Sequence, residues 1–204
     1  MLPEDPHYFI GFPVSALVEE QLEKWQEILS PYVNYRKWLN PEDFHITLKF
    51  LGSVSDEQLW QVKERLANIS IPHDLMLHIT GVNFFGKEDQ PRVMYADIAH
   101  TESLLALQKV VEQEMVSIGF DVERRPYRPH ITLAKKWLKD KKYFSADRLT
   151  EKLDMEKSID FPVNQLILYT VKRGQNNKSY EPVAVYPDLN IVNKTWDEED
   201  GAIN

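Results

Sequence analysis

Apolar and polar positions along this chain follow two periods, and the period changes at short intervals. Strand-like stretches, alternating or continuously apolar, cover residues 8–12, 35–39, 44–51, 75–85, 93–99, 130–134, 164–172 and 179–186. Apolar residues recur at helical spacing over 14–29, 56–69 and 101–118, while the weaker, charged stretch 137–153 indicates helix or loop. Because hairpin-like strand pairs alternate with helices, the pattern predicts an α+β fold with antiparallel sheets and helices packed outside them.

Local signals support the helix ends. Ser55-Asp-Glu-Gln58 is a capping-box pattern, in which a serine and a glutamine three residues later satisfy free backbone N–H groups at a helix start. Gly119 follows the third helical stretch, where a glycine can adopt the left-handed conformation that ends a helix.

One tetrapeptide, His-Ile-Thr-Leu, occurs twice, at residues 45–48 and 130–133. Each copy lies in a predicted strand, so the histidine shares a face with the threonine two residues later. Ile46, Leu48 and Phe50 are expected to face the helices in the first copy. A helix and an extended segment precede each copy, which indicates an internal duplication. Two such strands side by side would present two imidazoles and two hydroxyls to one cleft.

Composition limits the class of protein. The chain has 204 residues, 43% of them hydrophobic, which fits one domain or two fused lobes. Residues 1–186 are predicted to form a single bilobal domain, and residues 187–204 an acidic, flexible extension. There is no cysteine, which excludes disulfides, thiolate metal sites and a cysteine nucleophile. With no signal-like start and no long apolar run, we expect a cytoplasmic protein without a membrane partner.

The charge is unevenly distributed. A formal net charge of −8 disfavours a protein that coats nucleic acid, because such binding depends on Lys and Arg neutralising phosphates. Residues 124–148 are nevertheless strongly basic, and the second motif lies inside this stretch. The stretch is either a solvated basic surface or an anion-attracting one.

The paired motifs, with their flanking residues, resemble the two-histidine (2H) phosphoesterases, and specifically the bacterial RNA 2′,3′-cyclic phosphodiesterases also known as 2′-5′ RNA ligases. The residues that carry the resemblance are 7–13, 38–52, 91–95 and 125–134. It implies a bilobal α+β domain with a pseudo-two-fold axis, in which two antiparallel sheets line a central groove. It also implies a monomer that binds an RNA 3′ end or an oligonucleotide bearing a cyclic phosphate.

The family's chemistry transfers to matching positions only. By resemblance, His45 is the proton donor to the leaving ribose oxygen and His130 the proton acceptor that activates water. Imidazoles suit both roles because their ordinary pKa is near 6.5, and threonine hydroxyls can bond the phosphate oxygens. Thr47, Thr132, Arg128 and Lys135 are the predicted phosphate-binding residues, with Arg92 and Arg125 as further candidates. No cofactor or metal is expected, because no carboxylate stands at ligand spacing from either histidine.

Several alternatives stay open. Tyr127 is a candidate for stacking a base, and Trp38 and Phe44 are weaker ones, although each aromatic ring can equally serve in packing. The implied reaction yields a 2′-phosphate, with weak reverse 2′-5′ ligation. Other small substrates, such as 2′-5′ oligoadenylate or ADP-ribose cyclic phosphate, use the same histidines. A noncatalytic RNA-end-binding module is the alternative from a different class.

Overall fold

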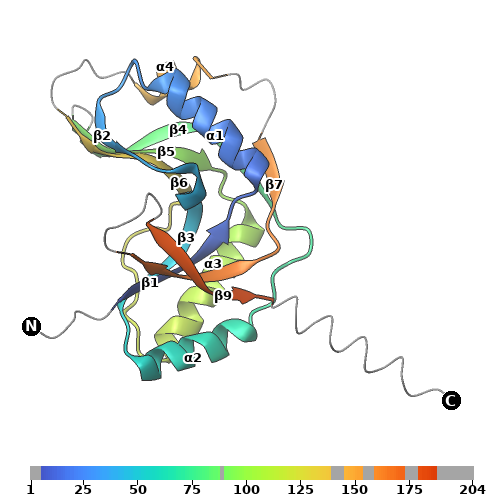
Figure 1. The fold of residues 1–204 in the computed structure, drawn as a ribbon. Coiled ribbons are helices and arrows are strands. Elements are labelled where there is room, and N and C mark those ends of the chain that lie inside the picture. Colours follow the sequence, from blue (N-terminus) through green and yellow to red (C-terminus); the bar gives the residue numbers. More distant parts are fainter. Residues whose placement is uncertain (1–5, 88–89, 139–144, 154–158, 173–178, 188–204) are drawn as a thin grey trace, which may run out of the picture.

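A computed structural model describes residues 6–87, 90–138, 145–153, 159–172 and 179–187, and shows an α+β fold (Figure 1). The helices are α1 (Ala16–Leu29), α2 (Asp56–Ala67), α3 (Glu102–Ser117) and α4 (Ala146–Thr150), with a 3-10 turn η1 (Pro41–Asp43). The strands are β1 (His7–Pro13), β2 (Tyr35–Trp38), β3 (His45–Ser53), β4 (Met76–Lys87), β5 (Gln90–Ile98), β6 (His130–Trp137), β7 (Ile159–Pro162), β8 (Leu166–Val171) and β9 (Tyr180–Tyr186).

All the described strands belong to one large antiparallel sheet. Its order is β7-β4-β5-β6-β3-β1-β8-β9, and β2 pairs with β6 beside this path. The two motif strands, β3 and β6, are therefore neighbours at the middle of the sheet, as a shared site requires.

The prediction of two separate sheets is wrong for the described strands. The β3–β6 register consists of Ile46 opposite Ile131, and both side chains are fully buried. Burial of these isoleucines brings the motif strands together at one point, and that contact links the two parts into one hydrogen-bonded path. Away from this pair, β3 pairs with β1, whereas β6 pairs with both β2 and β5.

The helices begin where the sequence predicts. The Ser55 side chain accepts a hydrogen bond from the Gln58 backbone N–H, and the Gln58 side chain accepts from the Ser55 N–H, so the capping box is confirmed. Ser15 and Thr101 cap α1 and α3 in the same way through their hydroxyls. Gly119 follows α3 with φ 96°, the left-handed conformation expected after a helix.

Helices α1 and α3 each cover the motif strand of the opposite half of the sequence. Figure 1 shows α1 beside the part of the sheet that contains β2 and β6, whereas α3 lies beside β3 and β1. Hydrogen bonds agree with the picture, since the Gln26 side chain on α1 reaches Leu133 of β6 and the Gln108 side chain on α3 reaches Leu48 of β3.

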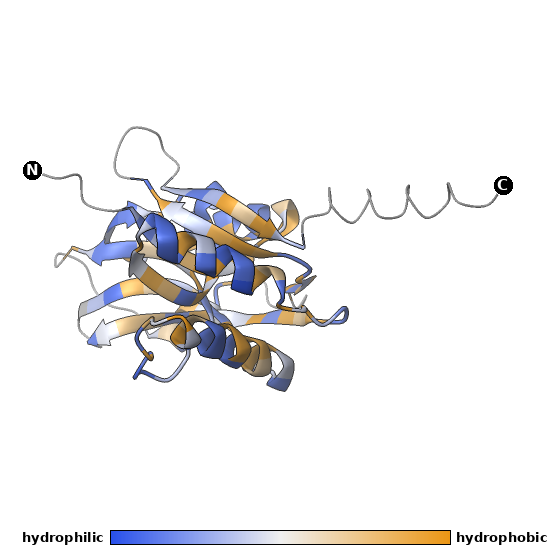
Figure 2. Ribbon diagram, turned by 90° about the horizontal axis from the view of Figure 1, so that it is seen from below, coloured by the Kyte–Doolittle hydropathy of each residue, from blue (hydrophilic) through white to orange (hydrophobic). Residues whose placement is uncertain are grey.

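Apolar faces of helices and strands meet in a continuous core. Figure 2 shows hydrophilic and hydrophobic residues in alternating bands along these elements, as expected when one face of each is buried. The largest fully buried side chains include Trp25, Phe12 and Tyr95. Among the described residues, no helix combines the length and apolarity needed to cross a bilayer.

Three elements differ from the sequence prediction. Strand β7 was missed, because it is a four-residue edge strand that ends at a proline and has no clear alternation. Strand β6 extends three residues past Ala134 to Trp137, where the charged Lys135 and Lys136 hide the pattern. Helix α4 provides the helical part of 137–153. The predicted acidic extension lies outside the described residues, except for Pro187.

Candidate active site

The register of β3 and β6 places the four predicted motif side chains on one face. Ile46 opposes Ile131 in an antiparallel pair, so continuing the register by one residue sets His45 toward Thr132 and Thr47 toward His130. The isoleucines point into the core, and the histidines and threonines, all half-buried, point to the opposite side. In such an arrangement the histidines are diagonal neighbours, which in a regular antiparallel pair lie about 7–8 Å apart.

A close approach of β1 supports the first motif. Gly11 pairs with Thr47, and a Cβ atom on Gly11 would lie 2.5 Å from the backbone oxygen of Ile46. Only glycine therefore fits at this position without displacing the motif strand.

Both histidine rings are oriented by the same contact. The Nδ1 atom of His45 lies 2.7 Å from the carbonyl oxygen of Asp43, and Nδ1 of His130 lies 2.8 Å from the carbonyl oxygen of Arg128. A carbonyl oxygen only accepts, so Nδ1 carries the proton in both rings. This fixes the neutral tautomer and leaves Nε2 as the nitrogen that can take or give a proton.

Burial lowers the pKa of both histidines. The pKa of His45 falls to about 4, chiefly because burial disfavours the charged ring, and the positive charge of Lys135 and the nearby His130 add to this, although the Asp43 carbonyl and carboxylate oppose it. The pKa of His130 is lowered for the same main reason, with Lys135 lowering it further and Arg128 O and Asp97 raising it. In the free protein both rings are therefore neutral at pH 7.

Aromatic rings surround each histidine, and the sequence analysis did not assign them to the site. Phe9 and Tyr180 lie 4.6 and 4.8 Å from the His45 ring centroid, and Tyr169 lies 5.8 Å from it. Phe85 and Tyr95 lie 4.8 and 5.2 Å from the ring of His130. The strands that carry these rings come near the motifs through the strand order of the sheet, and the periodicity of a single sequence does not reveal strand order.

Asp43 also belongs to the surroundings of His45, although the sequence indicated only a turn at this position. Its side chain is buried, with 3% exposed, and its carboxylate accepts hydrogen bonds from the backbone N–H groups of Ser179 and Tyr180. Because its carbonyl oxygen also accepts the hydrogen bond from Nδ1–H of His45, Asp43 connects the first motif to strand β9.

Of the predicted basic residues, Lys135 and Arg128 lie by the histidines. Lys135 Nζ is 3.4 Å from the Tyr180 hydroxyl and acts electrostatically on both rings. The Arg128 side chain bonds to Tyr95, the ring beside His130. Arg125 instead forms an exposed ion pair with Glu123, and Arg92 is exposed.

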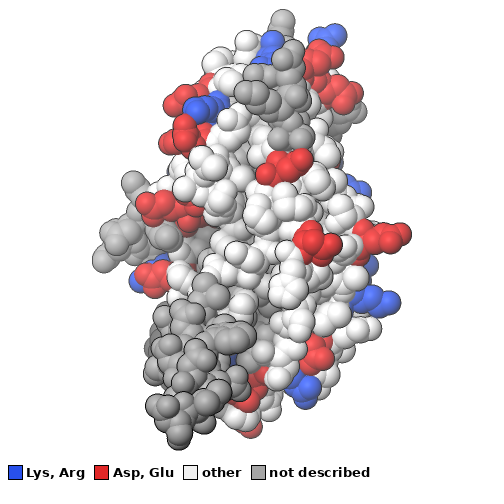
Figure 3. All heavy atoms as spheres, turned by 90° about the vertical axis from the view of Figure 1, so that its right-hand side faces the viewer, with Lys and Arg blue, Asp and Glu red and all other residues white. Residues whose placement is uncertain are grey.

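The wider surface gives no broad basic face in the view of Figure 3, where acidic side chains predominate among the coloured atoms. Part of the predicted basic stretch, Lys139 to Lys142, lies outside the described residues.

The candidate stacking residues differ in burial. Phe44 is buried, with 4% exposed, which favours packing. Trp38 and Tyr127 pack against the core, and the Tyr127 hydroxyl is buried. Burial raises the pKa of Tyr127. The burial of these three rings therefore favours packing over base stacking.

A β-bulge follows the threonine in both motifs. Along β1, Ile10 and Gly11 pair with Lys49 and Thr47, so Leu48 is an extra residue in β3. Along β5, Met94 and Tyr95 pair with Ala134 and Thr132, so Leu133 is the equivalent extra residue in β6. Bulges recur next to active sites because they redirect the side chains that follow.

The bulges reverse which side chains face the core. Lys49 is buried instead of facing the groove, and Phe50 is 59% exposed, so the prediction that Phe50 faces the helices is wrong. In β6 the same reversal buries Ala134 and turns Lys135 toward the histidines. A regular strand would have put Lys135 on the core side.

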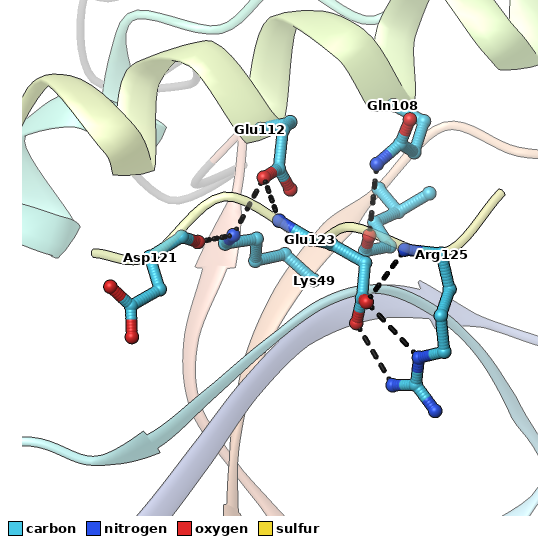
Figure 4. Close-up of polar contacts among 7 residues, drawn as sticks. Lys49, Gln108, Glu112, Asp121, Glu123 and Arg125 are labelled. Carbon is cyan, nitrogen blue, oxygen red and sulfur yellow. Dashed lines mark hydrogen bonds and ion pairs between the residues drawn. The ribbon is translucent and has the colours of Figure 1, made fainter. Parts of the chain in front are cut away.

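Lys49 joins the first motif strand to the segment that leads to the second (Figure 4). Its ammonium lies 2.8 Å from Glu112 Oε1 on α3 and 2.6 Å from the carbonyl oxygen of Asp121. Glu112 Oε1 also accepts a hydrogen bond from the Glu123 backbone N–H. The irregular segment before His130 is thus held by a buried ion pair.

The described residues include one further cavity. A cavity of about 460 Å³ lies between β4, β5 and α4, but its lining includes Asp97, Asp147 and Glu151, which disfavours a phosphate ligand. Within the described part of the chain, no group of three or more His, Asp or Glu residues is arranged to hold a metal ion.

Comparison with known families and proteins gives a consistent result. The model of the family described as "AKAP7 2'5' RNA ligase-like domain" matches residues 6–187. An RNA 2′,3′-cyclic phosphodiesterase of Geobacillus stearothermophilus is 31% identical over 186 residues, 90% of this chain and 57% of the relative. The chain thus spans little more than half of that protein. One of the same description from Bacillus subtilis is 35% identical over 133 residues, 65% of this chain and 72% of the relative.

Solved structures share the fold. The crystal structure of E. coli LigT complexed with 3′-AMP superposes with a TM-score of 0.72 at 20% sequence identity, covering 89% of this chain and 98% of that one. The structure of TT0787 of Thermus thermophilus gives a TM-score of 0.72 at 19% identity, covering 88% of this chain and 96% of that one. At these identities the likeness concerns the fold alone.

Proposed function

The chain belongs to the 2′5′ RNA ligase-like family of two-histidine phosphoesterases, and we propose that it hydrolyses RNA ends bearing a 2′,3′-cyclic phosphate to a terminal 2′-phosphate. The relatives named RNA 2′,3′-cyclic phosphodiesterase support the activity. The observation that carries the proposal is the pair of half-buried imidazoles on one face of adjacent strands, each with Nδ1 bonded to a carbonyl and Nε2 left for chemistry.

The reaction divides between the two rings. Neutral His130 accepts a proton at Nε2 from water as the water oxygen attacks phosphorus. The bond between phosphorus and the ribose 3′ oxygen breaks, and protonated His45 gives its Nε2 proton to that oxygen, leaving the phosphate on the 2′ oxygen. The net change adds one water, and the two rings exchange protonation states. Each group of this kind commonly contributes about 10²–10⁴-fold in rate.

Phosphate binding favours the protonated form of His45, which the lowered pKa disfavours in the free protein. A bound cyclic phosphate carries a negative charge, which favours the protonated ring beside it and raises its pKa. The Asp43 carboxylate, on the same side, acts in the same direction. Thr47 and Thr132 donate their hydroxyl protons to the nonbridging oxygens, and Lys135 and Arg128 balance the charge that builds on them.

We also infer that the family domain spans residues 1–186 and arose by duplication, with a pseudo-two-fold relation between its halves. The repeated tetrapeptide, the equivalent bulges at Leu48 and Leu133, and the equivalent histidine contacts support this inference.

A mononucleotide-sized substrate is the second candidate. E. coli LigT, which shares the fold, was crystallised with 3′-AMP and with ATP. Kinetics with a cyclic-phosphate-terminated oligonucleotide and with small cyclic nucleotides or 2′-5′ oligoadenylate, measured in parallel, would distinguish the two by their kcat/KM ratio. Weak 2′-5′ ligation is expected when the 5′-hydroxyl of a second RNA end attacks phosphorus in place of water, while the bond from phosphorus to the ribose 3′ oxygen breaks as in hydrolysis.

The direct test is turnover of an oligonucleotide ending in 2′,3′-cyclic phosphate, with EDTA present because the proposed chemistry needs no metal. The wild-type protein should release a 2′-phosphate end, and His45→Ala and His130→Ala should each lower kcat at least 100-fold, by the usual contribution of such groups. His78→Ala is the matched control, since His78 pairs with Asp160 at the surface. Unchanged substrate, or equal rates in the motif variants and the control, would overturn the proposal.

A further inference from the structure

One glutamine on α1 holds the bulge of the second motif strand. Gln26 Nε2 lies 2.9 Å from the carbonyl oxygen of Leu133, the extra residue of β6, and 3.0 Å from the carbonyl oxygen of Leu39. The Leu39 backbone N–H also donates to the Leu133 oxygen at 2.9 Å. Both hydrogens of the amide can therefore be used, and they fasten two chain segments at the point where β6 changes its alternation.

The residue that this bulge redirects is Lys135, two positions further along β6. Its Nζ lies 3.4 Å from the Tyr180 hydroxyl, whose ring lies against His45. We propose that Gln26 is a positioning residue, which keeps Lys135 directed toward the two histidines by holding the Leu133 carbonyl. The proposal rests on the proposed function only for the use of Lys135 as a phosphate-binding group.

The first motif provides a natural comparison. Gln108 on α3 donates to the carbonyl oxygen of Leu48, the extra residue of β3, at 3.4 Å. The residue two positions further is Phe50, which has no charge. The same kind of contact thus recurs at both bulges, but only the one made by Gln26 positions a cation.

The electrostatic consequence is specific, because Lys135 lowers the pKa of both motif histidines. Other charged and titratable groups near the rings come from different elements: Asp43 from η1, Asp97 and Tyr95 from β5, Arg128 before β6, Tyr169 from β8 and Tyr180 from β9. Lys37 of β2 pairs with Lys135 in the sheet. Glu19 of α1 acts electrostatically on Tyr169 and is unchanged in the variants. Because Gln26 itself carries no charge, a change at Gln26 should reach the histidines through the β6 backbone.

The test follows the pKa of each motif histidine by NMR titration, which needs no turnover. Lys135→Met should raise both pKa values, since a positive charge is removed. Gln26→Met keeps the size of the side chain but loses its hydrogen-bond donors. It should also raise the pKa of both histidines, and each increase should be no larger than that caused by Lys135→Met. The double variant should match Lys135→Met alone. Gln108→Met is the matched control and should leave both pKa values unchanged.

Activity provides a second measurement. Gln26→Met should lower kcat/KM for the cyclic-phosphate oligonucleotide roughly tenfold, the equivalent of one or two lost hydrogen bonds, whereas Gln108→Met should change it much less. Gln26→Asn, with a shorter side chain that cannot span both carbonyls, replaces Gln26→Met if that variant does not fold.

Unchanged histidine titrations in the Gln26 variants, or a double variant whose shifts are the sum of both single ones, would overturn the inference. A wild-type protein without turnover but with the expected titrations would instead reject the proposed function alone.

Discussion

At the scale of single residues, the two histidines share a tautomer but stand in different surroundings. Each Nδ1–H donates a hydrogen bond to the carbonyl oxygen two residues earlier, and burial lowers both pKa values. Acid–base catalysis needs one ring protonated and the other neutral. At pH 7 the free protein holds mostly two neutral rings, because the pKa of His45 falls to about 4 and that of His130 is also lowered from its ordinary value.

We therefore expect kcat/KM for the cyclic-phosphate substrate to be greatest below pH 6.5, because kcat/KM reports the free protein. The kcat profile, which reports the complex, should lie at higher pH, since the bound phosphate raises the pKa of the ring that donates. A kcat/KM optimum above pH 7 would contradict this. Stability must be followed in parallel, because lowered histidine pKa values mean that the unfolded state binds more protons and stability falls as pH drops from 6.5 toward 4.

A period of two and a repeated tetrapeptide suffice to predict that the four motif side chains share one face, and the burial patterns of β3 and β6 agree with that prediction. It could not predict Asp43 or Tyr180 as partners of His45. Their contact depends on a chain return of more than a hundred residues, from η1 to β9. The catalytic roles of the motif residues remain predictions.

At the scale of elements, α3 is attached to β3 by a buried ion pair, Lys49 with Glu112, whose side chains are 4% and 17% exposed. Removing one member of a buried pair leaves the other charge without compensation. We expect Lys49→Met to lower the free energy of unfolding by roughly 3 kcal/mol. Urea unfolding, with the slope checked for constancy, provides the measurement.

The control is Arg65→Gln, which breaks the Arg65–Glu114 pair between α2 and α3, where both side chains are well exposed. Such surface pairs contribute about 0–1 kcal/mol. Adding Glu112→Leu to Lys49→Met should restore part of the loss, because an apolar pair can replace a buried ionic one. Equal effects of Lys49→Met and Arg65→Gln would contradict the assignment.

Element existence was more predictable than strand detail. The helices with capping residues and the strands of clear alternation were found within a few residues of their ends. The bulges at Leu48 and Leu133 could not be predicted, because a residue is extra only relative to the strand with which its own strand pairs. Missing the first one led directly to the wrong orientation of Phe50.

At the scale of the whole molecule, the halves of the sequence exchange their helices. Gln26 of α1 bonds to β6, and Gln108 and Glu112 of α3 bond to β3. The repeat in the sequence indicated a duplication but not this exchange, because amphipathic helices reveal that they have a buried face and not which strand covers it.

The exchange implies that neither half can complete its core alone. The connection between α2 and β4 at residues 72–74 is exposed, so the chain can be divided after Pro72 without interrupting a helix or strand. We expect fragments 1–72 and 73–204 to lack cooperative unfolding when separate, and to regain it, with the CD spectrum of the intact chain, when mixed. Fragment 1–72 would leave β3 without α3, and the second fragment would leave β6 without α1 and β2. A cooperative transition in either isolated fragment would show instead that each half folds on its own helices, and that the contacts of Gln26 and Gln108 form only after two stable units have docked.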